Sequence, residues 1–223
     1  DLVEKNAKIM TDVVTQIKEH EYKGILLIVS NSVDIMTQVA MEVSGFPEHR
    51  VFGSGTVLDS ARLRYHLGQH LGVDSRSVHA FVIGEHGDSE IAAWSSANVS
   101  GVPLNSFCEM RGHFNHEGNT ESIEEQVKNS AYEIIAKKDA TYYGIAMVVK
   151  RICQAIVRDE KSIFPISLRM HGEYALEDVV LSMPAIVGAR GIETTIPISL
   201  DEKEVSRLHE SAEMLRETRK EIR

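Results

Sequence analysis

The chain has 223 residues, of which 43% are hydrophobic, and its 33 acidic and 24 basic residues give a formal net charge of −9. This composition is typical of a globular protein with a buried core, in one large or two modest domains, and the acidic balance argues against a nucleic-acid partner. The two cysteines form no Cys-x-x-Cys pair and the longest apolar run, residues 24–29, is far shorter than the roughly 20 residues of a membrane span, so we expect a cytoplasmic protein with no disulfide framework, no zinc cluster and no membrane partner.

The first residues predict a helix followed by a strand. Apolar residues at helical spacing begin at once, as if inside a domain, and the helix is expected to end near Gly24. Residues 25–29 are apolar throughout, which is typical of a strand buried on both faces of a parallel sheet. Ser30 and Asn31 follow the carboxyl end of this strand, where ligands of open α/β sheets bind. Asn31 is therefore a candidate ligand-binding residue.

The following elements are predicted as a helix, a short strand and a helix, over residues 33–44, 50–53 and 57–71. The third of these helices carries Asp59 and Arg62 three positions apart, and hence on one face. Arg64 lies two residues beyond Arg62, and two steps of about 100° turn it to the other side of the helix. The two arginines are therefore not expected to share a ligand.

Residues 78–84 predict a strand that leads into a glycine-flanked turn, residues 84–89 (GEHGDS), with His86 at its centre. The alternation of side chains in this region favours a mixed or antiparallel sheet. Residues 112–120 are polar and contain glycine, which predicts an exposed loop.

The remaining elements are predicted as two helices, two strands, a turn and a final helix. The last helix begins with a capping box formed by Ser199 and Glu202, and it buries a stripe of apolar side chains. The helices cover residues 123–137 and 142–157, the strands 163–167 and 179–183 and the turn 188–191, and the stripe of the final helix contains Val205, Leu208, Ala212 and Leu215.

Three residue types point to acid-base chemistry on a small carboxylic acid. The unperturbed imidazole pKa of about 6.5 suits proton transfer near neutral pH, so His86 is a candidate acid and base, and Asp59 could orient it. The guanidinium of Arg62 matches a carboxylate with two parallel hydrogen bonds. A metal site and a hydrolase site are weaker alternatives.

A metal site at His113 and His116 lacks further ligands in a suitable pattern, so no metal is expected. A hydrolase site at Ser89 lacks the Gly-x-Ser-x-Gly turn.

Four stretches together resemble the signatures of L-lactate dehydrogenases. They are residues 31–34 (NSVD), 53–62 (GSGTVLDSAR), 84–89 (GEHGDS) and 187–191 (VGARG), and the resemblance runs from the first residue to the last. It implies an α/β fold, in which the carboxyl-terminal remainder of a Rossmann-type parallel sheet is followed by an α+β substrate domain with mixed or antiparallel sheets. The expected domains are residues 1–55 (dinucleotide-binding, truncated) and 56–223 (catalytic). An NAD cofactor and pyruvate or L-lactate as substrate follow from the same resemblance.

The resemblance also implies roles for individual residues. His86 is expected to give a proton to the carbonyl of pyruvate as a hydride arrives from the nicotinamide, and to take the proton back in lactate oxidation. Asp59 is expected to hold one tautomer of His86 and to favour its protonated form. Arg62 is expected to bind the substrate carboxylate.

Three further residues are expected to surround the substrate and cofactor. Asn31 would hydrogen-bond the reacting oxygen and, with Ser30, contact NAD, and Thr141 would line the substrate pocket. Two departures from the family affect them. Ser32 stands where the family has proline, which favours a trans bond after Asn31 because a cis bond before a non-proline residue costs about 2.5 to 4 kcal/mol. Asp139 stands where a glycine often precedes the pocket threonine.

Arg64 and His79 resemble the pair with which bacterial lactate dehydrogenases bind fructose 1,6-bisphosphate between subunits. This resemblance implies an allosteric homotetramer of glycolysis and fermentation. A solvated arginine and a strand histidine are the alternative interpretation.

The family begins with a strand, a Gly-x-Gly-x-x-Gly turn, an acidic residue for the ribose and a mobile loop with an arginine, none of which is found in this sequence. We therefore expect the remainder of a longer enzyme, which alone binds the dinucleotide poorly and turns over little. Residues 84–86 (Gly-Glu-His) resemble the lactate form more than the malate form. A malate or other 2-hydroxy-acid dehydrogenase, or a catalytically silent fragment that acts in oligomerisation, remains the alternative.

Overall fold

The structure, a computed structural model, describes residues 2–139 and 141–222. The helices are α1 (Leu2–Glu19), α2 (Val33–Ser44), α3 (Val57–Leu71), α4 (Leu104–Met110), α5 (His116–Lys138), α6 (Tyr143–Val157) and α7 (Glu202–Glu221). The strands are β1 (Leu26–Ile28), β2 (Val51–Gly53), β3 (Val78–His79), β4 (Val82–Ile83), β5 (Ile91–Ala92), β6 (Asn98–Val99), β7 (Val102–Pro103), β8 (Ser162–His171), β9 (Glu177–Gly188) and β10 (Gly191–Thr195). Short 3-10 turns occupy Glu48–Arg50, Ser75–Ser77, Trp94–Ser96 and Glu173–Ala175.

The predicted strand, helix and strand near the start of the chain are confirmed as a parallel unit. β1 and β2 pair in parallel, with Leu26 opposite Val51, and α2 connects them. α2 ends at Gly45, which adopts the left-handed conformation (φ 60°) that glycine accepts without a steric penalty. The apolar side chains of this unit form much of the main core.

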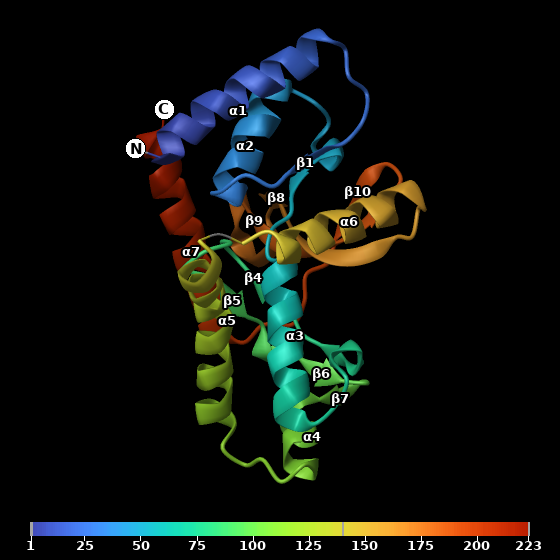
Figure 1. Cartoon of the computed structure of the whole chain (residues 1–223), viewed down its shortest axis with the longest axis vertical. Coiled ribbons are helices and arrows are strands. Elements are labelled where there is room, and N and C mark those ends of the chain that lie inside the picture. The colour runs from blue at the N-terminus through green and yellow to red at the C-terminus, as the bar shows by residue number, and fades with distance from the viewer. Residues whose placement is uncertain (1, 140, 223) are drawn as a thin grey trace.

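A single five-stranded sheet joins the first and last thirds of the chain. Its order is β1-β2-β8-β9-β10, and β2 meets β8 in antiparallel fashion at Gly53 and Ser167. α1 and α2 lie together at the upper end of the molecule in Figure 1, and α7 reaches back beside α1, so the two ends of the chain lie near each other. The α/β fold class with mixed parallel and antiparallel pairing is confirmed.

The lower half of the molecule is built around α3 and α5, which run side by side (Figure 1). The expected strand over residues 78–84 is divided, because β3 pairs with β6 and β4 pairs with β5 in two separate small sheets. Both pairings are antiparallel, as predicted. The division leaves β4 at the end of α3 that carries Asp59.

Two helix boundaries differ from the prediction. α1 ends at Glu19 rather than near Gly24, because Glu21 takes a positive φ of 52° that breaks the helical path. α5 begins at His116, so half of the expected loop at residues 112–120 is helical. Asn115 explains the early start, since its side-chain oxygen accepts a hydrogen bond from the Gly118 N–H at 3.4 Å and caps the helix.

Two local features are also corrected. The capping box of α7 is formed by Asp201 and Glu204, two residues later than predicted, with hydrogen bonds of 2.8 and 2.9 Å in the two directions. The peptide bond between Asn31 and Ser32 is cis, not trans. Hydrogen bonds hold the chain on both sides of this bond: the Asn6 side chain donates to the Asn31 carbonyl at 2.9 Å, and the Met36 N–H donates to the Ser32 carbonyl at 2.9 Å.

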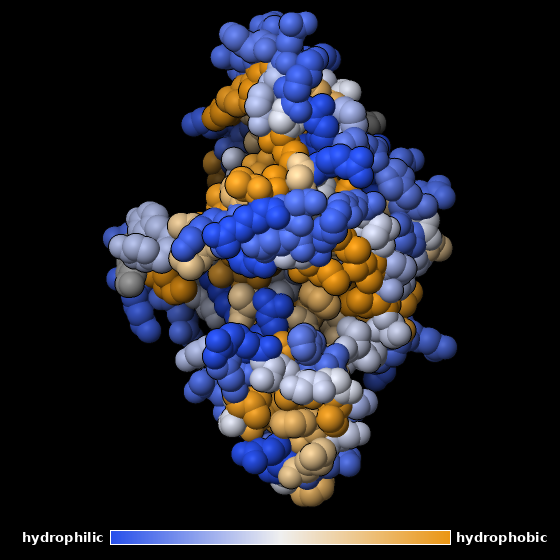
Figure 2. Space-filling model, turned by 90° about the vertical axis from the view of Figure 1, so that its right-hand side faces the viewer, coloured by the Kyte–Doolittle hydropathy of each residue, from blue (hydrophilic) through white to orange (hydrophobic). Residues whose placement is uncertain are grey.

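Apolar patches interrupt the polar surface on the face where β10 and the end of α6 lie (Figure 2). Val157, at the end of α6, is 84% exposed, and Ile163 on β8 is 48% exposed. β1 is hydrogen-bonded to a strand on one side only within the described residues. Exposed apolar surface of this kind is typical of a contact with another chain or domain. Among the described helices, none has the length and apolar character needed to cross a membrane.

Candidate active site

α3 is fixed against β4, the strand that leads into the histidine turn. The Thr56 hydroxyl, just before α3, donates to the Val82 carbonyl at 2.5 Å, and the Val82 N–H donates to the Ser60 hydroxyl at 2.8 Å. Both serine and threonine side chains are buried. The first turn of α3, with Asp59 in it, is therefore held next to the start of the histidine turn.

The turn itself is held from two sides. Gly84 adopts a positive φ of 83° and exchanges two backbone hydrogen bonds with Ser182 on β9, at 2.8 and 2.9 Å. A Cβ atom at Gly84 would approach the Ser211 Oγ to 3.0 Å, so glycine is needed here for both conformation and space. Ser211 on α7 accepts the Glu85 N–H at 2.9 Å. These contacts fix the position from which His86 projects.

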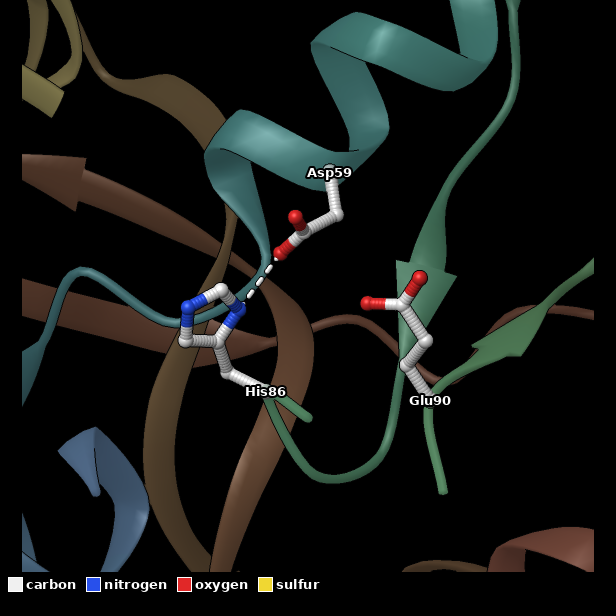
Figure 3. Close-up of side chains that lie close together, drawn as sticks. All are labelled: Asp59, His86 and Glu90. Carbon is white, nitrogen blue, oxygen red and sulfur yellow. Dashed lines mark hydrogen bonds and ion pairs between the residues drawn. The ribbon is translucent and has the colours of Figure 1, made fainter. Parts of the chain in front are cut away.

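The structure brings together three of the predicted side chains. His86 Nδ1 lies 2.6 Å from Asp59 Oδ2, and an Arg62 guanidinium nitrogen lies 3.1 Å from Asp59 Oδ1 (Figure 3 shows the first pair). The side chain of Asp59 is only 4% exposed, whereas that of His86 is 29% exposed. Asp59 is therefore a buried bridge, and His86 and Arg62 can reach a ligand.

Protonation of His86 is favoured in this setting. Burial alone would lower the pKa of His86, but the hydrogen bond and charge of Asp59, with the charges of Asp34 and Glu90, raise the pKa to about 9. His86 therefore carries a proton at neutral pH and can act as a general acid.

A cavity of about 310 Å³ opens beside this group. Asn31, Arg62 and His86 are among its lining residues, and Lys128 and Tyr132 of α5 line its other side. The Tyr132 hydroxyl donates to Asp88 at 3.2 Å and so joins α5 to the histidine turn. The cavity lining combines Arg62, Lys128 and a protonated His86 with the carboxyl groups of Asp59, Glu85, Asp88 and Glu90. Recognition of a carboxylate there would therefore depend on the paired donors of Arg62 rather than on a net positive field.

Glu90 is a functional candidate that sequence reasoning missed. It is 5% exposed, its side chain makes no hydrogen bond or ion pair with another described residue, and its carboxylate points toward His86 and Asp59 (Figure 3). Burial, and then the charge of Asp59, raise the pKa of Glu90. Its position four residues after His86 in a tight turn was the one signal available. The hydrogen bond and charge of Asp59 remain the largest contributions that hold the proton on His86.

The same three side chains offer possible metal ligands. One donor atom from each of Asp59, His86 and Glu90 lies within 4.8 Å of the others. Both oxygens of Asp59 already have partners, one with Arg62 and the other with His86. The arrangement therefore fits proton transfer better than a cation.

The residues expected around the substrate and cofactor are less closely grouped. Asn31 and Ser30 are exposed beyond the carboxyl end of β1, and Asn31, but not Ser30, lines the cavity. Thr141 is half-buried between α5 and α6 and is not among the lining residues. Asp139 adopts a positive φ of 61° at the end of α5, which explains why glycine suits that position.

The expected effector residues lie away from this cavity. Arg64 is half-buried on α3, where burial lowers its pKa, and it makes no ion pair with a described residue. His79 is exposed on β3. Only Arg62 of the two arginines on α3 lines the active-site cavity, in agreement with the predicted helix geometry.

Comparison with known proteins gives consistent matches along the chain. Residues 1–53 match the domain family described as "lactate/malate dehydrogenase, NAD binding domain", and residues 56–223 match "lactate/malate dehydrogenase, alpha/beta C-terminal domain". The chain is 46% identical to the L-lactate dehydrogenase of Acetivibrio thermocellus over 97% of this chain and 68% of that protein. It is 45% identical to that of Thermoanaerobacterium saccharolyticum, over 100% and 71%.

Solved structures agree with the sequence relatives. The minor L-lactate dehydrogenase from Enterococcus mundtii in the ligands-bound form superimposes with a TM-score of 0.96 at 40% identity, over 100% of this chain and 71% of that one. A lactate dehydrogenase from a Medee basin deep-sea metagenome library gives a TM-score of 0.95 at 43% identity, over 99% and 70%.

Proposed function

The chain belongs to the lactate/malate dehydrogenase family, and from this premise we propose that it carries the proton-transfer and substrate-binding part of an NAD-dependent L-lactate dehydrogenase. The reaction is reversible hydride transfer between NADH and pyruvate, which gives L-lactate. The single observation that carries the proposal is the Asp59–His86 hydrogen bond beside Arg62 in one cavity.

The chemistry follows from the hydrogen-bond pattern. Nδ1 of His86 is hydrogen-bonded to Asp59, so Nε2 is the nitrogen that exchanges a proton with the substrate. In pyruvate reduction His86 gives this proton to the carbonyl oxygen while the carbonyl carbon accepts the hydride, and in lactate oxidation it takes the proton back. Arg62 binds the substrate carboxylate through its paired N–H donors. The Asp59 charge stabilises the imidazolium before the proton is transferred.

The residues at the end of β1 fit the cofactor. Asn31 is exposed there and shares its cavity with His86, and open α/β sheets bind dinucleotides at such strand ends. NAD supplies or accepts the hydride when it is bound. Asn31 and Ser30 would contact its nicotinamide side, and the Asn31 amide would hold the reacting oxygen next to His86.

The alternatives are not favoured. The relatives reported above are named L-lactate dehydrogenases, not malate dehydrogenases. A silent oligomerisation fragment does not require a buried aspartate that raises the pKa of a cavity histidine. Because the chain spans 68% of the Acetivibrio thermocellus relative, we propose that its own turnover is low.

Assembly and regulation are further parts of the proposal. The apolar patches at Val157 and Ile163 support a homo-oligomer, with a tetramer as the proposed state. Arg64, a half-buried cation without an ion pair, supports an anion site that it would share with His79, for which fructose 1,6-bisphosphate is the proposed effector.

The domain division at residue 55 is supported by the family matches on its two sides. Cys108 and Cys153 are free thiols, which supports a cytoplasmic location. Membership of the family supports a place in glycolytic or fermentative metabolism.

The test is a spectrophotometric assay of NADH oxidation with pyruvate and, separately, with oxaloacetate. The full chain is assayed alone and as a chimera that supplies the segment of the Acetivibrio thermocellus enzyme that it does not match. We expect low turnover by the chain alone, and pyruvate reduction by the chimera at a far higher rate than oxaloacetate reduction. A chimera that unfolds cooperatively yet reduces neither substrate, or prefers oxaloacetate, would overturn the proposal.

A further inference from the structure

Asp34 is a buried carboxylate that joins the histidine turn to the sheet. It is the second residue of α2 and is 1% exposed. One oxygen, Oδ2, accepts the backbone N–H of His86 at 2.7 Å. The other, Oδ1, accepts the Ser167 hydroxyl at 2.6 Å, with the Ser182 hydroxyl at 3.5 Å. The side chain therefore contacts α2, β8, β9 and the turn at once.

These contacts converge at one place on the sheet. Ser167 and Ser182 are directly opposite each other on β8 and β9. The backbone of Gly84, two residues before His86, pairs with the backbone of Ser182. Asp34 thus completes a frame in which the sheet holds the start of the turn and a carboxylate holds its centre.

Ionisation of a carboxyl group at this buried position costs free energy unless hydrogen bonds to the charged form offset it. Burial raises the pKa of Asp34 to about 6, against the opposing effect of its hydrogen bonds from Ser167 and His86. It is nevertheless ionised at neutral pH, and an ionised acceptor makes a shorter and stronger hydrogen bond than a neutral one. An apolar residue here would leave both the His86 N–H and the Ser167 hydroxyl without the acceptor that Asp34 supplies.

Asp34 also lies three residues after Asn31, with the intervening chain forming the start of α2. We propose that Asp34 is a positioning residue that fixes His86 relative to Asn31, so that the proton donor and the amide that holds the reacting oxygen keep one mutual distance. This inference rests on the proposed function. It predicts that the loss of Asp34 disturbs the orientation of His86 rather than the binding of the substrate carboxylate.

The first test measures the hydrogen bond itself. Amide hydrogen exchange of His86 is followed by NMR in the full chain, for D34A, D34N and the control T37V. We expect D34A to accelerate exchange by about tenfold or more. D34N should keep slow exchange, because its amide oxygen can still accept the bond while its NH2 group faces Ser167. Unchanged exchange in D34A would overturn the proposal.

T37V is a matched control in the same helix. The Thr37 hydroxyl is buried and donates to the Val33 carbonyl at 2.7 Å, and its removal costs α2 a hydrogen bond without touching the turn. We expect the exchange of His86 in T37V to match the unsubstituted chain. Acceleration as large as in D34A would mean that any weakening of α2 has the same effect, and would contradict a positioning role.

The second test separates kcat from KM in the chimera. We expect D34A to lower kcat for pyruvate by about 100-fold, the loss associated with about 1 Å of misplacement, with KM nearly unchanged because Arg62 is held separately by Asp59. D34N should restore most of kcat. A rise in KM with kcat unchanged would refute the proposal.

A substitute variant and a readout that needs no substrate make the two tests conclusive. If D34A does not fold, S167A takes its place, since it removes the hydroxyl that holds Oδ1 of Asp34. We expect faster amide exchange at His86 in S167A. Unchanged exchange would count against the positioning role of Asp34. The exchange experiment needs no substrate, so an inactive chimera would overturn the proposed function while this result still stood on its own.

Discussion

The Asp59 carboxylate and the His86 imidazole are joined by a hydrogen bond of 2.6 Å between Oδ2 and Nδ1. The other oxygen of the same carboxylate pairs with Arg62 at 3.1 Å. One buried side chain therefore raises the pKa of His86 and holds the guanidinium of Arg62. This shared partner would let the proposed proton donor and the proposed carboxylate-binding residue act on one small molecule.

The pH dependence of the chimera reports the proton on His86. The folded pKa is raised from 6.5 to about 9, so the imidazolium persists through neutral pH and is lost as the pH rises through about 9. We expect kcat/KM for pyruvate reduction to fall above that pH, while kcat/KM for lactate oxidation, which needs the neutral ring, rises. Parallel profiles in the two directions would be inconsistent with this role.

Asp59→Asn removes the charge but keeps the shape of the side chain. We expect kcat for pyruvate reduction to fall by about 100-fold or more, as for the loss of an oriented general acid. The descending limb of the pH profile should move from about 9 toward 6.5, because the charge of Asp59 helps to raise the pKa. NMR titration of the His86 ring measures the shift directly, and an unmoved titration curve would argue against the pair.

Arg62→Lys keeps the positive charge but loses the planar pair of donors. We expect kcat/KM for pyruvate to fall by about 10- to 100-fold, mainly through a higher KM, because a single ammonium cannot replace the bidentate contact. Arg64→Lys on the opposite side of the helix is the matched control, measured without effector. Equal losses in the two variants would show that the charge of α3, rather than the Arg62 contact, matters.

Much of the local structure was accessible from the sequence because local chemistry determines it. The limits of α3 follow from its apolar spacing and from Gly72, and the facing positions of Asp59 and Arg62 follow from the helical repeat. The start of α5 could not be predicted from composition, because its polar residues are typical of a loop and the Asn115 side chain caps a helix there. The predicted capping box of α7 was wrong for a similar reason. Ser199 and Asp201 are each followed three residues later by a glutamate, and the helix uses Asp201.

Long-range contacts could not be predicted in this way. Asp34 lies within a motif that sequence analysis singled out, yet its role depends on Ser167, 133 residues away. Glu90 gives no pattern of its own, and only burial beside Asp59 makes it a candidate. Thr141 shows the reverse case, since its expected role came from resemblance and the structure does not place it on the cavity wall.

Asp34→Asn should also change stability with a defined sign. The folded pKa of this carboxyl is raised from 3.8 to about 6, so its ionisation destabilises the fold, and the stability present below pH 3.8 is lost as the pH rises through about 6. The difference corresponds to roughly 3 kcal/mol. We therefore expect D34N to gain in free energy of unfolding relative to the unsubstituted chain between pH 4 and pH 7, as measured by urea denaturation. A constant difference across this range would contradict the assigned shift.

The central claim is that His86, oriented by Asp59, is the proton donor for pyruvate. The most direct measurement is the steady-state rate of pyruvate reduction by the chimera with His86→Asn, compared with the unsubstituted chimera. Binding of NADH to both is followed by fluorescence. We expect turnover to fall by about 100-fold or more while NADH binding is unchanged. A His86→Asn chimera that keeps its turnover would contradict the account.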